Sequence, residues 1–204
     1  MKADGFPSLA PDEWTVLGHR LRPLSLGHAI LLQALDSPFA TWLKDPPKTV
    51  TVYDVLLAVE VCRRPWPAAR RWLTSRAWPW HMKWRHIRWA LWWRNDTSEQ
   101  IVLREKAGQL YEYSAYWNQG PECNTTSDGR MAGAPHLRRL FTFLVSHMHM
   151  SESQALGTTV ADAVWHFCVY WEMNGTLQIG NDVDRALVKA AEAAAMAEAL
   201  KHRN

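Results

Sequence analysis

One segment, residues 63–94, concentrates the side chains that could do chemistry. It holds nine positive charges and eight tryptophans, and no acidic residue occurs from Val61 to Asn95. We call it the Trp/Arg segment; its members are Arg63, Arg64, Trp66, Arg70, Arg71, Trp72, Arg76, Trp78, Trp80, Lys83, Trp84, Arg85, Arg88, Trp89, Trp92, Trp93 and Arg94. A guanidinium beside an indole can form a cation–π pair inside a protein, stack on bases while neutralising phosphates, or anchor a chain at a membrane interface. Each use requires different neighbours.

Two interpretations of the Trp/Arg segment involve only protein. In the first, the indoles are core residues covered by arginine stems, and the rest of the chain neutralises the segment, because the formal charge of the whole chain is only +3. In the second, the segment forms a protein-binding surface, since Trp and Arg are enriched in binding hot spots. For that surface we predict the partner-binding residues Trp84, Arg85, Arg88, Trp89, Trp92 and Trp93. We expect the two arginines to pair with acidic residues of the partner.

A third interpretation is a nucleic-acid-binding helical module that uses residues 63–94. No helix-turn-helix, zinc-finger or RRM pattern accompanies the charge, which counts against it. A membrane surface is disfavoured because Pro65, Pro67 and Pro79 interrupt any continuous amphipathic face. The salt dependence of binding separates a nucleic-acid partner from a protein partner, because counterion release makes phosphate binding steeply salt-dependent.

The other chemically active side chains do not match a catalytic or metal-binding motif. His147 and His149, like His166 and Cys168, are two residues apart, which on a helix places the side chains about 200° apart. Neither pair can hold one ion. The HExxH, GxSxG and P-loop motifs do not occur. We therefore predict a protein that is not an enzyme and has no cofactor and no metal; a concave pocket with convergent polar groups would reopen the enzyme alternative.

The cysteines and the hydropathy point to a cytoplasmic protein. Cys62, Cys123 and Cys168 are scattered and form no CxxC pair, which is typical of free thiols in a reducing compartment. No apolar run reaches the roughly 18 residues that span a bilayer, so we expect no membrane span.

Apolar residues recur with the helical period of 3.6 along most of the chain, and no convincing alternation of period two occurs. This pattern predicts an all-α fold, a compact domain of about six to eight helices, with no sheet larger than a hairpin. We expect helices near residues 26–35 (capped by Ser25), 54–64 (capped by Asp54), 68–76, 80–94, 97–118, 136–150, 159–174 and 181–202, with one turn after Ser151. Pro79 is expected to separate the two Trp-rich helices.

Residues 118–135 are rich in Gly, Pro, Asn, Ser and Thr, a composition typical of an irregular segment. We predict one helical domain over residues 1–204, in which a mobile loop at 118–135 separates the Trp/Arg-rich part from a C-terminal helical part. Trypsin is expected to cut this loop first at Arg130.

Two stretches, about a third of the chain together, resemble proteins of phages and prophages. Residues 151–177 resemble the closing segment of small proteins encoded in tail-morphogenesis clusters, an E-x-x-x-L turn followed by a helix that ends in aromatic residues, Glu and Gly. The matching positions are Glu152, Leu156, Ala161, Tyr170, Glu172 and Gly175, whereas Gly157-Thr158 stands where a Pro is frequent. Residues 23–39 together with 54–65 are similar to uncharacterised prophage proteins.

The resemblance implies a non-enzymatic protein like the tail assembly chaperones, which binds another phage component such as the long tape-measure protein or another tail protein. Chaperones of that kind need exposed aromatic and aliphatic anchors for helical clients, and Trp-rich surfaces supply them. The implied location is the host cell cytoplasm. The Trp/Arg segment has no counterpart in the family pattern, which leaves a virion structural subunit open. The oligomeric state is not predicted.

Overall fold

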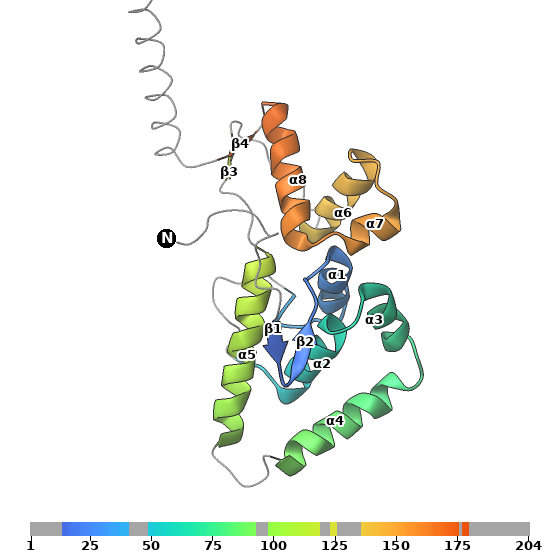
Figure 1. Cartoon of the computed structure of the whole chain (residues 1–204), viewed down its shortest axis with the longest axis vertical. Coiled ribbons are helices and arrows are strands. Elements are labelled where there is room, and N and C mark those ends of the chain that lie inside the picture. The colour runs from blue at the N-terminus through green and yellow to red at the C-terminus, as the bar shows by residue number, and fades with distance from the viewer. Residues whose placement is uncertain are drawn as a thin grey trace, which may run out of the picture. The chain divides into compact units, whose positions relative to one another are not determined.

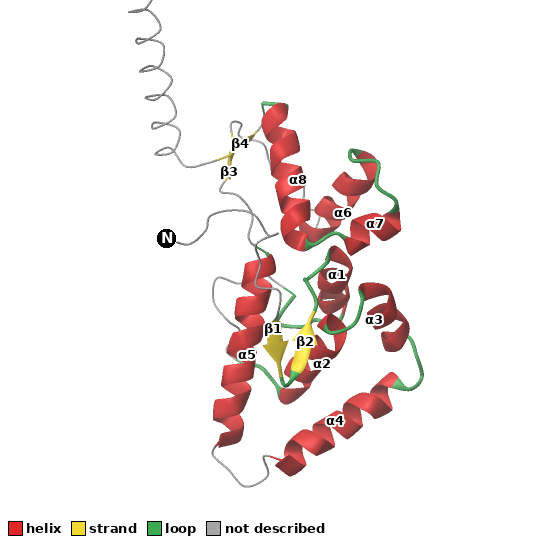
Figure 2. Ribbon diagram, in the orientation of Figure 1, coloured by secondary structure: helices red, strands yellow, loops and turns green. Residues whose placement is uncertain are grey.

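The computed structural model describes residues 14–40, 49–92, 98–118, 123–125, 136–175 and 177–179. Most of these residues are helical, which confirms the predicted all-α class (Figures 1 and 2). In chain order the elements are β1 (Trp14–Val16), β2 (His19–Leu21), α1 (Leu26–Ala34), α2 (Val52–Cys62), α3 (Trp66–Leu73), α4 (Trp78–Trp92), α5 (Ser98–Trp117), β3 (Cys123–Thr125), α6 (His136–Ser146), α7 (Glu152–Gly157), α8 (Val160–Met173) and β4 (Leu177–Ile179). Within these ranges no helix combines the length and the apolar character that a bilayer crossing requires.

The chain divides into two compact units. The first comprises residues 1–119 and 134–164, and the second comprises residues 120–133 and 165–204. The second unit holds β3 and β4, which pair antiparallel with Cys123 opposite Ile179. Strand β3 therefore places regular structure inside the segment that we expected to be irregular, because backbone pairing with a distant strand overrides a turn-rich composition.

Helix α2 is the centre of the first unit. Every residue from Val55 to Cys62 is buried, and α1, α3, α4 and α5 pack around it. A helix that is apolar on nearly all sides is typical of such a position, and Glu60 is the one ionisable carboxylate in this buried run. The helix begins three residues earlier than predicted: Thr51 is the N-cap and Asp54 completes a capping box with it.

Strands β1 and β2 form a hairpin that the sequence reading missed. Its two-residue turn, Leu17–Gly18, has positive φ at both positions, 53° and 70°, as a type I′ turn requires. Val16 and Leu21 are buried, and the hairpin packs against α5 and α2 (Figure 1). Leucine is an unusual residue at positive φ, so the turn lacks the Asn-Gly or Asp-Gly signal that predicts such hairpins.

Two hydrogen bonds fasten the chain around α1 to helix α5. The Tyr113 hydroxyl donates to the Arg22 carbonyl at 2.6 Å, and the Ser114 hydroxyl donates to the Phe39 carbonyl at 3.0 Å. Tyr113 and Ser114 are both buried. The N-terminal part of the first unit is thus held by a helix that lies far along the chain.

A glycine sets the approach of three helices in the first unit. A Cβ at Gly27 of α1 would lie 2.7 Å from Cδ2 of Trp66, the first residue of α3, and 3.0 Å from the carbonyl oxygen of Leu156 in α7. Both distances are shorter than van der Waals contact, so only glycine fits here without displacing a neighbour.

The remaining predicted boundaries divide into three groups. The caps at Ser25 and Ser151 are confirmed, each as a complete capping box. Pro79 does not interrupt a helix, because it lies in the first turn of α4, where no backbone N–H is needed for an intrahelical hydrogen bond. Thr97, Arg130 and the helix predicted at 181–202 lie outside the described residues.

Candidate functional site

Helix α4, which carries the centre of the Trp/Arg segment, has two different apolar faces. Met82 and Trp89 are buried, 1% and 5% exposed, and the helix packs on α2. The opposite side carries a stripe of large apolar side chains that are exposed: Trp80 (66%), Trp84 (63%), Ile87 (41%) and Leu91 (59%). Their spacing of four, three and four residues keeps them on one side of a helix. We call these four residues the outer stripe.

The six predicted partner-binding residues do not share one face. Trp84 belongs to the outer stripe. Trp89 is buried, which corrects its assignment as an exposed anchor: five residues beyond Trp84 on a helix is about 140° around the axis, and that side meets the core. Arg85 is bound within the chain, and Arg88 is exposed. The side chain of Trp92 and the whole of Trp93 lie outside the described residues.

Three arginines of the Trp/Arg segment converge on one buried carboxylate, Glu60. The Glu60 side chain is 0% exposed, and Arg63 donates to its Oε2 from Nε at 2.9 Å. Arg64 binds the same oxygen, and Arg85 binds Oε1. Burial acts to raise the pKa of Glu60, but the hydrogen bond from Arg64 and the charges of the three arginines outweigh it and hold the pKa below its ordinary value.

These three cations form an internal cluster around one carboxylate, and Arg85 therefore already has an acidic partner within its own chain. Glu60 stands just before the acid-free run, three and four residues ahead of Arg63 and Arg64. That helical spacing was a readable signal for these two pairs. An internal cation–π pair accompanies them, with the Arg64 guanidinium 4.4 Å from the centre of the Trp72 ring.

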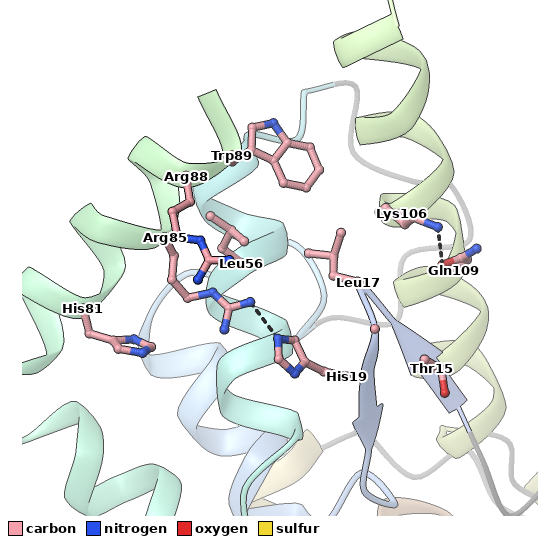
Figure 3. A pocket seen from close by; sticks show the side chains of 11 residues that line it. Thr15, Leu17, His19, Leu56, His81, Arg85, Arg88, Trp89, Lys106 and Gln109 are labelled. Carbon is pink, nitrogen blue, oxygen red and sulfur yellow. Dashed lines mark hydrogen bonds between the residues drawn. The ribbon is translucent and has the colours of Figure 1, made fainter. Parts of the chain in front are cut away.

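A cavity of about 710 Å³ lies beside the Glu60 cluster, between the β1–β2 hairpin and helices α2, α4 and α5 (Figure 3). We call it the hairpin cavity. Three permanent cations line it, Arg85 and Arg88 from α4 and Lys106 from α5. Its apolar lining comes from Leu17, Leu56 and Trp89, and further polar groups are supplied by Thr15, His19, His81 and Gln109. None of the described residues that line it is Asp or Glu.

The two histidines of the hairpin cavity are neutral at pH 7. Arg85 Nη2 lies 2.8 Å from His19 Nε2, and a guanidinium only donates, so this nitrogen is the bare acceptor and the ring proton resides on Nδ1. Burial, together with the charges of Arg85 and Arg63, lowers the pKa of His19. Burial is also the main cause that lowers the pKa of His81. The positive charge of the cavity therefore comes from its arginines and its lysine.

Sequence reasoning singled out Arg85, Arg88 and Trp89, although for a partner surface, and missed the walls that come from the hairpin and from α5. His19 and Leu17 come from the hairpin, which was not predicted. Lys106 and Gln109 come from α5, for which the sequence predicted a helix but no functional residue. No local signal could have joined these segments, because the cavity exists only where four separate elements meet.

Comparisons with protein-family models, with curated proteins and with solved structures found no match to this chain. In the part of the chain that the structure describes, no group of three or more His, Cys, Asp or Glu side chains is placed to hold a metal ion. Cys62 is fully buried, and burial raises the pKa of its thiol to about 12, so it is not a nucleophile at neutral pH.

Proposed function

We propose that this protein is a non-enzymatic assembly protein that binds a helical segment of another protein on the outer stripe of α4. The observation that carries the proposal is the exposure of Trp80, Trp84, Ile87 and Leu91 along one side of a helix whose other side is fixed in the core. Contiguous exposed apolar residues at helical spacing are the signature of a docking surface for a partner helix.

The charges beside the stripe specify the chemistry of the partner. At about 100° per residue, Lys83 lies on one side of the outer stripe and Arg88 lies on the other, and both are exposed. The Lys83 ammonium is 5.7 Å from the centre of the Trp80 ring, which keeps this charge next to the stripe. The complementary partner is an amphipathic helix whose apolar face has acidic residues along both edges.

The class of partner follows from the resemblance of residues 23–39, 54–65 and 151–177 to prophage proteins. We propose a phage component, such as a tape-measure or other tail protein, and a role like that of a tail assembly chaperone. Tape-measure proteins are long helical clients, and the outer stripe offers them two large aromatic anchors. The support for this role is the resemblance together with the exposed stripe.

The direct test measures binding of the full chain to tail proteins from its own gene cluster by titration calorimetry. Replacing Trp80 and Trp84 together by Ala should weaken binding by about 10³-fold, because buried Trp anchors contribute about 2 kcal/mol or more each to such interfaces. The melting temperature should stay unchanged, since both indoles are exposed. The matched control is Ile101→Ala on α5, an equally exposed apolar residue outside the stripe, which should leave affinity unchanged. A folded double variant that still binds would refute the proposal.

Nucleic acid is the second candidate, and one observation favours it. The exposed surfaces of α3, α4 and the turn between them carry five cations, Arg70, Arg71, Arg76, Lys83 and Arg88. A salt titration decides between the two: between 50 and 200 mM salt a helical partner should bind up to about tenfold more weakly, whereas a duplex held by many phosphate contacts should lose about 10³-fold or more.

A further inference from the structure

We propose that the hairpin cavity binds a small organic anion in which a flat apolar body carries a carboxylate or phosphate group. Arg88 borders both this cavity and the outer stripe, but the other lining residues lie outside the stripe and the inference does not depend on the proposed function. The inference rests on the size of the cavity, on the charges that face it and on the way one of those charges is held in place.

The volume and the walls define the body of the ligand. About 710 Å³ lies within the range of roughly 300–1,000 Å³ that small-molecule sites occupy. Figure 3 shows the Trp89 indole and the Leu17 and Leu56 side chains around the open space, with the cations on either side. A ring system can cover these apolar groups while its anionic group reaches a cation.

The surplus of positive charge is built into the fold. Glu60 binds Arg63, Arg64 and the lining residue Arg85 with a side chain that is 0% exposed, so three cations share one buried carboxylate. One negative charge cannot neutralise three positive ones, so this group of described residues keeps a net positive charge beside the cavity. The Lys106 ammonium pairs with Glu105 at 2.8 Å and donates to Gln109 Oε1 at 3.4 Å. The Glu105 side chain is 55% exposed, and such surface pairs are weak enough for a bound anion to replace.

Arg85 is pre-positioned to donate to that anion. Its Nη1 binds Glu60 and its Nη2 binds His19, so the guanidinium is fixed from two sides while three of its five N–H groups are not used by these bonds. A donor that is already ordered loses little entropy on binding, which favours affinity. Figure 3 shows this guanidinium between His19 and helix α4 at the edge of the cavity.

The test is calorimetric titration of the full chain at low ionic strength with four probes. Adenosine monophosphate and 2-naphthoate each combine a flat body with an anion, one a phosphate and the other a carboxylate. Adenosine lacks the charge, and inorganic phosphate lacks the body. We expect at least one of the first two to bind with a Kd below about 1 mM and at least about tenfold more tightly than adenosine and inorganic phosphate, and the better of the two identifies the anionic group.

Matched variants locate the binding. Arg88→Ala and Lys106→Ala should each weaken binding about tenfold, because each removes one charge-assisted contact. Lys83→Ala on α4 and Arg104→Ala on α5 remove the same charge from exposed positions of the same helices outside the cavity and should leave affinity within about twofold. The proposal is refuted if neither organic anion binds, if inorganic phosphate binds as tightly as both, or if the control variants weaken binding as much as the cavity variants.

Discussion

His28 takes a place in a capping box that glutamate or glutamine usually occupies. Its Nδ1 accepts a hydrogen bond from the Ser25 backbone N–H at 3.3 Å, so the ring proton resides on Nε2, which donates to the Arg64 carbonyl at 2.8 Å. The side chain is buried, and burial lowers the pKa of His28 to about 4. A neutral imidazole thus joins the start of α1 to the end of α2.

This geometry predicts a loss of stability in mild acid. Between an unfolded pKa of about 6.5 and a folded pKa of about 4, only the unfolded chain binds the proton, so the stability that neutral His28 provides falls as pH falls through that window. From pH 7 to pH 4.5 the free energy of unfolding should decrease by about 2–3 kcal/mol through this group, measured by urea denaturation. His28→Gln keeps an acceptor for the cap and cannot titrate. An equal loss in that variant would contradict the prediction.

Glu60 should be the most sensitive charged residue for folding. Glu60→Gln removes the only charge that the described network offers to Arg63, Arg64 and Arg85, and leaves their guanidiniums partly buried and unpaired. Disrupting a buried pair in this way costs about 3–5 kcal/mol. The control Glu105→Gln breaks an exposed pair and should cost less than about 1 kcal/mol. Chemical denaturation of both variants checks the contrast, and similar costs for the two would show that the cluster adds no special stability.

Among the elements, helices α1 and α5 offer a matched pair of glycines. Gly27→Ala should destabilise the protein by about 1–3 kcal/mol, because the new methyl group collides with Trp66 and with the carbonyl of Leu156. Gly108→Ala in α5 should instead stabilise it by up to about 1 kcal/mol, because nothing lies within 4 Å of the new Cβ and alanine favours helix. Thermal melts of the two variants should shift in opposite directions. Shifts of the same sign would contradict the packing described for α1.

The helices were predictable where local chemistry sets them, and less so elsewhere. The Ser25 and Ser151 caps follow from hydrogen bonds within four residues, and the structure has them as expected. The hairpin was missed because its turn uses Leu17 at positive φ, which no local rule favours. In α4, tertiary packing determines which tryptophan is exposed. Trp84 and Trp89 are the same residue type on one helix, and only packing against α2 makes Trp89 buried while Trp84 stays exposed.

At the scale of the whole molecule, the position of α2 among four helices predicts the pattern of hydrogen exchange. Amides from Val55 to Cys62 should exchange most slowly in the first unit, since opening them requires α1, α3, α4 and α5 to separate. Amides of α4 should exchange faster, because one side of that helix is exposed. Native-state exchange followed by mass spectrometry measures both. Slower exchange in α4 than in α2 would show that α2 is not the last element to open.

The candidate site lies at this same scale, which is why the sequence predicted so little of it. The cations of the Trp/Arg segment are evident from composition, but which of them serve the fold depends on Glu60, 25 residues from Arg85. The hairpin cavity needs walls from residues as far apart as Thr15 and Gln109. Hydrophobic periodicity and capping patterns describe residues that are close in the sequence, so they contain no information on contacts between distant segments.

The bond from Tyr113 to Arg22 also has a consequence for protein synthesis. Its two residues are 91 positions apart, and a ribosome that adds about 5–20 residues per second needs about 5–18 s to bridge them. Throughout that interval the nascent chain contains the sequence of the β1–β2 hairpin, and later that of α2, but the α5 segment that covers them is still incomplete. Apolar side chains such as Val16 and Leu21, which are buried in the folded protein, are then accessible to ribosome-associated chaperones. The N-terminal part of the first unit can complete its packing only after α5 has been synthesised.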